Sequence, residues 1–397
     1  MTARSAAQAD LKRKGKSAPD PSFGRLHISQ WLETWRTPSV GWPFYPLADR
    51  VRRTLAALLD AADFAPVRTP AHNAEVAQGV KLLCYAGQAQ GPVALLVPAP
   101  IKAATIWDLL PRASAVRRLL QAGFRVYLIE WDPPGAKEVG FGLAQYADEL
   151  IAACCDTIRK ETGAHRVVLL GHSLGGTLAA LYAALHPDRV SALVLFGAPL
   201  HFGPNSGALG RLAGMIPPGE YLPAMEGNIP GTVIDSLSLI ISPAAFVWSR
   251  WLDLAASLRN KDALETHLAV ERWTLQEMPM ARRLFDDVVQ RLLRDNSFMR
   301  GVLEINGVSA APGNVTAPVL AVVDPRCPIA PPQSVQPFLD AVATDDVQML
   351  TYVGDRGVSL QHVGMLVGRN AHRQLWPRIV AWLAVRAMPS TMSHGSS

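Results

Sequence analysis

The sequence of 397 residues predicts an α/β fold with a mostly parallel, doubly wound sheet that is interrupted by an inserted helical cap. Three observations predict it. Short runs rich in Val, Leu and Ile alternate with amphipathic segments, as buried parallel strands and their covering helices do. This alternation stops near residue 200, where the pattern becomes helical and aromatic, and it resumes near residue 318. A Gly-His-Ser-Leu-Gly motif directly follows one of the predicted strands.

The composition excludes a disordered chain. Hydrophobic residues make up 49% and charged residues 18% of the sequence, and the mean hydropathy is +0.13, at the apolar end of soluble globular proteins. No run approaches the roughly 18 uninterrupted apolar residues of a membrane helix, so we expect no membrane span. The 4 cysteines match neither a metal-binding spacing nor a disulfide framework, which indicates a reduced, cytoplasmic protein.

The net charge of +5 is concentrated at the N-terminus, in Lys12, Arg13, Lys14 and Lys16. These residues lie among Ala, Ser, Gly and Pro and are followed by no apolar segment, so we expect no signal peptide. A flexible, solvated tail is favoured over a segment that touches nucleic acid or an anionic granule surface. The predicted parts are this basic tail (1–43), a core in two pieces (44–199 and 318–386), the cap (200–317) and a flexible C-terminal tail (387–397).

Apolar residues recur at helical spacing from Trp31 to Leu59, which predicts N-terminal helices. We expect the stretch 44–75 to pack against the larger part of the protein. The predicted strands are 80–85, 93–97, 125–131, 166–170 and 193–196 before the cap, and 318–323 and 348–353 after it. The predicted covering helices are 114–122, 143–162, 177–186 and 371–385. The cap is aromatic, and its Trp248, Trp251, Trp273, Phe285 and Phe298 predict either an apolar tunnel for an acyl chain or, more simply, helix packing.

Residues 171–175 form the G-x-S-x-G pattern of a nucleophile elbow, between a predicted strand and a predicted helix. Glycines are needed there because the turn is too tight for β-carbons, and the strained turn exposes the hydroxyl of Ser173. Ser173 is therefore the predicted nucleophile. The amide of Leu174, at the positive end of the following helix, is a natural donor to an oxyanion. A second donor is expected from the loop after strand 93–97, and Ile101 is the candidate because the prolines of that loop have no N–H.

A serine needs a base to remove its proton, and His362 is the predicted base because it lies in a loop after the last predicted strand. His186, His201, His27, His72, His165 and His372 compete less well by position. The sequence does not decide which acidic residue orients the base. Asp324 is the nearest carboxylate after strand 318–323, Cys327 stands where an aspartate is expected, and Asp355, Asp132 and Glu130 are alternatives at other strand ends.

The chain resembles the poly(3-hydroxyalkanoate) synthase family, including its class III type, over roughly residues 44–386. Its elbow, extended by Gly176, is similar to the family's G-x-C-x-G-G pattern. The stretches that carry the resemblance are 95–101, 108–109, 114–117, 127–131, 171–176, 271–273, 362–364, 368–369 and 376–377, with Pro279, Phe285, Asn296 and His372. This resemblance implies the α/β-hydrolase fold, hydroxyacyl substrates and a dimer formed through the cap.

Two positions depart from the family: Ser173 replaces the nucleophilic cysteine, and Cys327 falls at the catalytic aspartate. Serine has a far higher pKa than cysteine, which favours esters and water. We therefore expect an acyl-transfer enzyme that acts on 3-hydroxyacyl esters or thioesters through acyl-Ser173. The alternatives are a true polymerase using hydroxyacyl-coenzyme A and a non-catalytic relative that binds granules or a synthase. No metal, nucleic acid or cofactor is implied, and coenzyme A enters only as part of a thioester.

Overall fold

A computed structural model describes residues 45–88, 90–215 and 227–387. The predicted N-terminal tail lies outside these residues, as does the predicted C-terminal tail apart from Ala387, which ends the last helix. Within the described ranges, no helix combines the length and the apolar character needed to cross a membrane.

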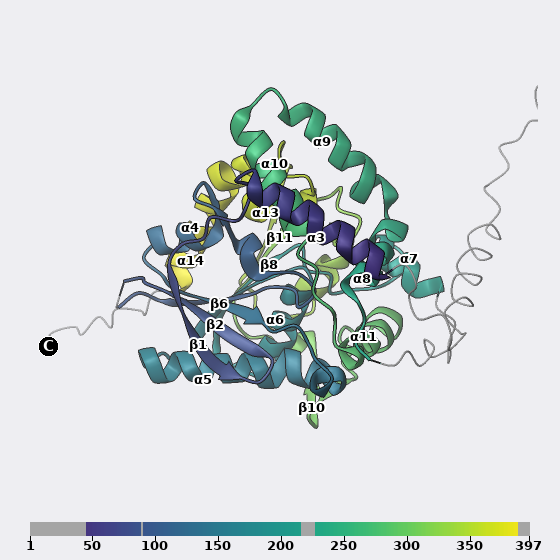
Figure 1. Cartoon of the computed structure of the whole chain (residues 1–397). Helices are drawn as coiled ribbons and strands as arrows, with labels where there is room; N and C mark the ends of the chain where they lie inside the picture. Colours follow the sequence, from purple (N-terminus) through teal and green to yellow (C-terminus); the bar gives the residue numbers. More distant parts are fainter. Residues whose placement is uncertain (1–44, 89, 216–226, 388–397) are drawn as a thin grey trace, which may run out of the picture. The chain divides into compact units, whose positions relative to one another are not determined.

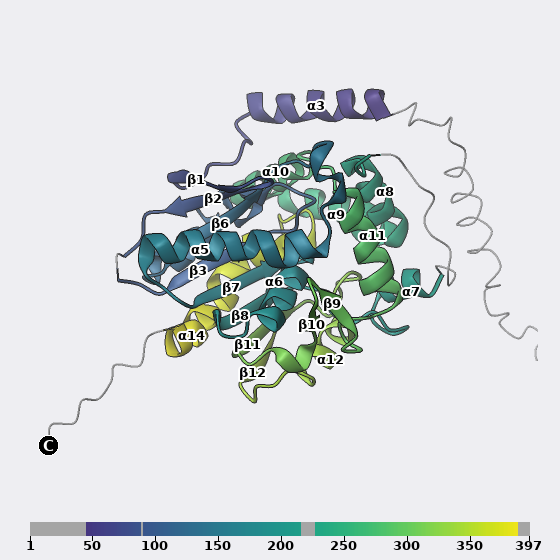
Figure 2. The ribbon, with the colours of Figure 1, turned by 90° about the horizontal axis from the view of Figure 1, so that it is seen from below.

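The core contains a sheet of 8 strands (Figure 1). Their order is β1-β2-β6-β3-β7-β8-β11-β12 (Figure 2). β1 pairs with β2 and β2 with β6 in antiparallel fashion, and every other pair is parallel. The predicted α/β fold with a mostly parallel sheet is confirmed. The strands are β1 (Ala71–Ala77), β2 (Val80–Tyr85), β3 (Val93–Val97), β6 (Arg125–Trp131), β7 (Val167–His172), β8 (Val190–Phe196), β11 (Val319–Val323) and β12 (Val347–Thr351).

The central strands are apolar on both faces because helices cover both sides of the sheet. Every residue of β3 and of β11 is buried. β1 is different: it lies at the sheet edge, most of its residues are exposed, and its sequence, Ala-His-Asn-Ala-Glu-Val-Ala, carries only one β-branched residue. This strand begins inside the stretch 44–75, which also contains the predicted helix α3 (Tyr45–Ala61).

Helices α5 and α6 lie over one face of the sheet (Figure 2), and α6 packs directly on β7 and β8. On the other side, α14 packs against β8 and α4, with the buried Trp376 ring stacked on Phe196 at 5.4 Å between centroids. This sandwich fixes the C-terminal ends of the strands, where the site lies. The core helices are α4 (Ala115–Gln121), α5 (Leu150–Thr162), α6 (Leu174–Leu185), α12 (Gln336–Leu339), α13 (Gln361–Val367) and α14 (Trp376–Ala387). Two short strands, β4 (Asp108–Leu110) and β5 (Ala113–Ser114), precede α4.

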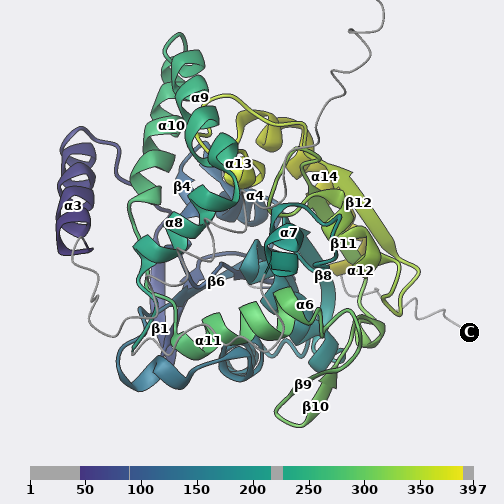
Figure 3. The ribbon, with the colours of Figure 1, turned by 90° about the vertical axis from the view of Figure 1, so that its right-hand side faces the viewer.

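The predicted cap region contains helices, as expected, and α9 and α10 lie side by side in it (Figure 3). It also contains a hairpin, β9 (Leu303–Ile305) with β10 (Val308–Ala310), which the sequence did not predict. Helix α3 is fastened to α10 by a bidentate pair in which Arg272 donates to both carboxylate oxygens of Asp60, at 2.6 and 2.7 Å. The helices of this region are α7 (Ala208–Met215), α8 (Gly231–Ile241), α9 (Ser249–Ser257), α10 (Lys261–Thr274) and α11 (Arg282–Asp287).

Candidate active site

The turn between β7 and α6 holds Ser173 in a strained backbone conformation. Its φ and ψ are 55° and −131°, in a region that side chains other than glycine rarely adopt. The Ser173 amide donates to the carbonyl of Phe196 at 2.9 Å, which ties the turn to the end of β8. The side chain is half-buried, and its hydroxyl makes no hydrogen bond within the described residues. This is the geometry expected of a nucleophile elbow.

The glycines of the motif are explained by close backbone contacts. A β-carbon on Gly171 would lie 2.5 Å from the Cα of Gly176. A β-carbon on Gly175 would lie 2.5 Å from the carbonyl carbon of Pro98, in the loop after β3. No side chain fits at such distances, so these glycines allow the loop after β3 to lie directly against the elbow.

The predicted oxyanion donors lie on these two adjoining segments. Leu174 is the first residue of α6, and its amide has no acceptor among the described residues, as is normal in a first helical turn. Ile101 follows the Pro98 segment that contacts Gly175, and its amide is likewise unpaired within the described part of the chain. The roles of Leu174 and Ile101 in binding an oxyanion stay predictions.

His362, the predicted base, lies at the same edge of the sheet as Ser173. A β-carbon on Gly197, the residue after Phe196, would be 3.1 Å from its Cε1. His362 Nε2 is buried and has no hydrogen-bond partner among the described residues, so it is not bonded to Ser173 in this state. Such bonds are often long or misaligned in free enzymes and tighten in the complex with substrate. His186 and His201 are engaged elsewhere, His186 with Asp148 and His201 with Asn296.

Burial controls the protonation of this histidine. It lowers the pKa of His362 well below the usual value, and the nearby ring of His172 lowers it further. His362 is therefore neutral near pH 7, as a general base must be. His172 is also buried, which lowers its pKa to about 4. Its Nε2–H donates to the backbone carbonyl of His362 at 2.9 Å, so the residue before the nucleophile holds the base in place.

The group at Nδ1 of His362 is Cys327 and not Asp324. The Cys327 Sγ lies 3.3 Å from Nδ1. One carboxylate oxygen of Asp324 accepts from the amide and the guanidinium of Arg326, at 2.9 and 3.3 Å, and the other has no partner among the described residues. The hydrogen bond that the sequence analysis expected between Asp324 and His362 is thus absent here, because the chain turns right after β11 and directs the carboxylate back onto its own loop.

The alternative carboxylates are also directed elsewhere. Asp355 accepts from the amides of Asn370 and Ala371, Asp132 pairs with Lys81 of β2, and Glu130 pairs with Arg68. Burial raises the pKa of the Cys327 thiol to about 11, so this partner of His362 is neutral at pH 7. The base has an orienting neighbour but no negative charge beside it.

Comparisons with known proteins indicate the same fold. A model of the alpha/beta hydrolase fold matches residues 108–218. The chain is 27% identical over 378 residues to the poly(3-hydroxyalkanoate) polymerase subunit PhaC of Haloarcula marismortui, covering 88% of this chain and 77% of that protein. It is 29% identical to the PhaC of Haloferax mediterranei, over 75% of this chain and 59% of that protein. The PhaC of Allochromatium vinosum is 26% identical, with 76% and 83% covered.

The chain has the α/β-hydrolase fold and is similar to the poly(3-hydroxyalkanoate) polymerase subunits over most of its length. The resemblance found in the sequence is confirmed. The chain is an enzyme of the hydrolase or acyltransferase kind. A solved structure, the monoacylglycerol lipase of Paleococcus ferrophilus, is 19% identical with a TM-score of 0.49 and covers 77% of this chain and 99% of its own.

One residue near the site was not singled out in the sequence. Lys102, directly after Ile101, donates to Asp235 of α8 and to the carbonyl of Thr274 of α10, both at 2.8 Å. It also forms an isolated antiparallel bridge with Glu277, whose pKa is raised to about 7 by burial and by the neighbouring Asp235. In this synthase relative, the loop expected to supply an oxyanion donor is therefore fastened to the cap.

The aromatic residues of the cap do not share one environment. Trp273 is buried, with its Nε1–H donated to the carbonyl of Ala103 at 2.8 Å, and Phe298 is buried against Phe338. Trp248 and Trp251 are 69% and 66% exposed. The predicted tunnel therefore does not include these two tryptophans, and the buried aromatic residues contribute to packing.

One set of side chains has metal-ligand chemistry within the described residues. His72, Cys84 and Glu161 place one ligand atom each within 4.8 Å of one another, from β1, β2 and α5. These three residues are far apart in the sequence and form no local metal-binding motif, so the sequence did not indicate this group. Burial raises the pKa of Cys84 to about 11, which disfavours the thiolate that a metal needs.

Proposed function

We propose that the chain transfers 3-hydroxyacyl groups from an ester or thioester by way of Ser173. Ser173 Oγ attacks the acyl carbonyl carbon while Nε2 of His362 takes the hydroxyl proton. The carbonyl oxygen becomes an oxyanion next to the amides of Leu174 and Ile101. The C–S or C–O bond then breaks, and His362 returns the proton to the leaving thiolate or alkoxide.

The observation that carries this proposal is the strained, positive-φ backbone of Ser173 at the end of β7, at the same edge of the sheet as the neutral His362, whose Nε2 is buried. A non-glycine residue in such a conformation must be compensated by its surroundings, and strained residues cluster at active sites. The names of the relatives give the substrate class, since they are polymerases of 3-hydroxyalkanoates.

Water is the acceptor that we favour for the acyl group. In the second half-reaction, His362 removes a proton from the incoming water and its oxygen bonds to the acyl carbon. The bond from this carbon to Ser173 Oγ then breaks, and His362 returns the proton to Oγ. A polymerase must hold a growing chain in the position that water otherwise takes. The alkoxide of Ser173 is a poorer leaving group than a thiolate. An acyl group therefore exchanges between coenzyme A and Ser173 less readily than it exchanges between coenzyme A and a cysteine.

The direct test is the release of coenzyme A from 3-hydroxybutyryl-coenzyme A by the purified protein, with the product examined as free acid or insoluble polymer. Ser173→Ala is the matched control. Release that depends on Ser173 and gives free acid supports hydrolysis. If the thioester stays intact, simple 3-hydroxybutyrate esters and short polyesters are tried with the same pair of proteins, and inactivity towards all of them contradicts the proposal.

The second candidate function is polymerisation, which the relatives' names favour. It uses the same acyl-Ser173, and the acceptor becomes the hydroxyl of another 3-hydroxyacyl group. Insoluble polyester that is absent with Ser173→Ala selects this function over hydrolysis. A non-catalytic granule-binding or synthase-binding relative is the third reading, favoured by the neutral Cys327 beside His362.

We also propose that the exposed apolar face formed by Trp248 and the start of α9 binds a polyester surface. Trp248, Trp251 and Leu252 are each at least 66% exposed, and adjacent large apolar side chains on a surface mark interaction sites. Co-sedimentation with poly(3-hydroxybutyrate) particles should be reduced in Trp248→Ser/Trp251→Ser and unchanged in Val302→Ser/Val385→Ser, which removes exposed apolar residues elsewhere. Equal sedimentation of the two variants contradicts binding through α9. A change only in oligomeric state, measured by light scattering, assigns this face to a second copy instead and contradicts it too.

A further inference from the structure

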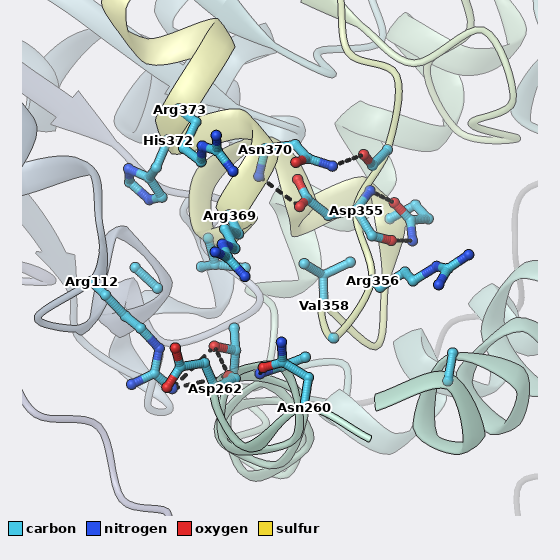
Figure 4. A pocket seen from close by; sticks show the side chains of 18 of the residues that line it. Arg112, Asn260, Asp262, Asp355, Arg356, Val358, Arg369, Asn370, His372 and Arg373 are labelled. Carbon is cyan, nitrogen blue, oxygen red and sulfur yellow. Dashed lines mark hydrogen bonds between the residues drawn. The ribbon is translucent and has the colours of Figure 1, made fainter. Parts of the chain in front are cut away.

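A large cleft lies beside the base loop and is not lined by Ser173 or His362. Its volume is about 1170 Å³, above the usual range of small-molecule sites. Three parts of the chain form most of it: the end of α9 with the start of α10, the loop 353–358 after β12, and the segment 369–373 (Figure 4). It adjoins the candidate active site through Gln361 and Arg326, the residues just before His362 and Cys327.

The cleft is strongly basic. Its lining includes 7 arginines and 2 aspartates. In Figure 4, Arg369 extends into the space between the yellow C-terminal segment and Asp262 of α10. The arginines are Arg112, Arg118, Arg259, Arg326, Arg356, Arg369 and Arg373. Their positions in the sequence are far apart, so folding alone gathers them.

Three of these arginines are held by acceptors of the protein. Arg112 pairs with Glu265 at 2.9 Å, Arg118 donates to Nδ1 of His372 at 3.1 Å, and Arg326 is bonded to Asp324 and to the carbonyl of Val353. The other four have neither an acidic partner nor a hydrogen-bond acceptor among the described residues. They are Arg259, Arg356, Arg369 and Arg373, and all four are exposed.

Two carboxylates, the buried Asp253 and the half-buried Asp355, hold the arginine-bearing segments in place and are not available to neutralise them. Both oxygens of Asp253 on α9 accept from the loop that follows Arg356, from the amides of Gly357 and Ser359 at 2.8 Å. Asp355 accepts from the amides of Asn370 and Ala371 at 2.7 and 3.1 Å. These two carboxylates thus face backbone N–H groups, and Asp262, the other aspartate of the lining, is exposed and forms no ion pair with the four arginines among the described residues.

We propose that this arginine cleft binds a small molecule that carries several phosphate groups. Four unpaired positive charges in one hollow repel one another, so a ligand of opposite charge gains from all of them. Guanidinium groups match phosphate oxygens through pairs of parallel hydrogen bonds. A single phosphate would meet only one or two of the four arginines. Their number and the size of the cleft therefore point to a ligand with phosphates at more than one position.

This chemistry has two sources. One is the diphosphate and ribose phosphate of coenzyme A, and this source rests on the proposed function, because it makes the cleft the holder of the leaving group beside the acyl site. The other is a free polyphosphate or phosphorylated metabolite, which is independent of the reaction. Inorganic triphosphate and coenzyme A are therefore the probes that separate the two.

The test is isothermal titration calorimetry of the full chain at low ionic strength with each probe. The cleft variant is Arg369→Gln/Arg373→Gln. Its matched control is Arg50→Gln/Arg378→Gln, which removes the same charge from two exposed arginines outside the cleft. Ser173→Ala is titrated in parallel, because it abolishes the proposed chemistry and leaves the cleft intact. Thermal unfolding checks that all variants fold.

We expect binding of at least one probe that is weakened tenfold or more in the cleft variant and is unchanged in the matched control and in Ser173→Ala. Tight binding of coenzyme A that triphosphate displaces assigns the cleft to the thioester substrate. Triphosphate binding as tight as that of coenzyme A assigns it to free phosphorylated ligands. Absence of binding by both probes, or equal weakening in the cleft and control variants, overturns the proposal. If the parent protein binds a probe but transfers no acyl group, the proposed function is contradicted and the proposed ligand site is not.

Discussion

The Sγ of Cys327 lies 3.3 Å from Nδ1 of His362, at the position where a triad acid orients its histidine. The nearest carboxylate in sequence, Asp324, is turned onto Arg326 instead. The base is therefore held by a neutral thiol from one side and by the hydrogen bond from His172 to its own carbonyl from the other. An uncharged partner can fix the ring but stabilises the imidazolium much less than a carboxylate does.

Cys327→Asp should therefore raise the rate of acyl transfer. The carboxylate would meet Nδ1–H and stabilise the imidazolium that forms when Ser173 loses its proton, and losing such an acid costs about 10⁴-fold in a known triad. We expect a gain in kcat of about tenfold or more in ester hydrolysis. Cys327→Ser, which adds no charge, is the control and should stay near the parent rate. A folded Cys327→Asp protein that is no faster than Cys327→Ser would contradict the assignment of His362 as base.

The pH dependence of kcat/KM should show a base with a depressed pKa. Burial and His172 lower the pKa of His362, so the neutral, active form persists below the ordinary histidine value of about 6.5. We expect activity to be level from pH 8 to 6.5 and to fall at more acidic pH. In Cys327→Asp, the new negative charge should move this fall to higher pH. A half-point above 7 in the parent protein would be inconsistent with the buried base.

Two buried histidines, His172 and His372, and the half-buried His362 also make the fold sensitive to acid. The pKa values of His172 and His372 are lowered to about 4 by burial, and that of His362 is lowered too. Their protons bind to the unfolded chain from about pH 6.5 downward, so stability is intact above that pH and is lost as pH falls toward the folded-state values. For His172 alone, the loss is about 3 kcal/mol. Urea unfolding at pH 7, 6 and 5 should show it, and equal midpoints would contradict the buried, neutral state.

His172 is a positioning residue for the base. Its Nε2–H is the donor to the carbonyl of His362, and without it a buried carbonyl loses its partner, at a cost of about 1–3 kcal/mol. His172→Leu should lower kcat severalfold with little change in KM, because the ring of His362 is misplaced while the substrate site is kept. His172→Gln keeps an amide donor and should recover much of the rate. If both variants lose kcat equally and are equally stable, the hydrogen bond from His172 does not position His362.

The strands of the core were predictable because buried parallel strands are short apolar runs. The segments 80–85, 93–97 and 125–131 agree residue for residue with β2, β3 and β6. β1 was missed because it is an edge strand, with small and polar side chains that face solvent. The β9–β10 hairpin was missed because each of its strands has only 3 residues, too few to show a period.

The candidate site likewise has features that the sequence predicts and features that depend on the fold. Ser173 and its glycines were predictable because the elbow is one continuous segment, and the structure places His362 at the same edge of the sheet. The partner of His362 was not predictable from the sequence. It depends on how the chain turns after β11 and on whether Asp324 or Cys327 faces the ring. The arginine cleft was invisible as well, because its unpaired arginines come from 3 separate segments that only the fold brings together.

The central claim is that Ser173 is acylated. The most direct measurement is the intact mass of the protein after reaction with a fluorophosphonate, followed by peptide mapping of the adduct, in the parent chain and in Ser173→Ala. The account predicts one adduct on Ser173, absent from Ser173→Ala and strongly reduced in His362→Ala. A folded parent protein that stays unmodified, or an adduct that persists in Ser173→Ala, would contradict it.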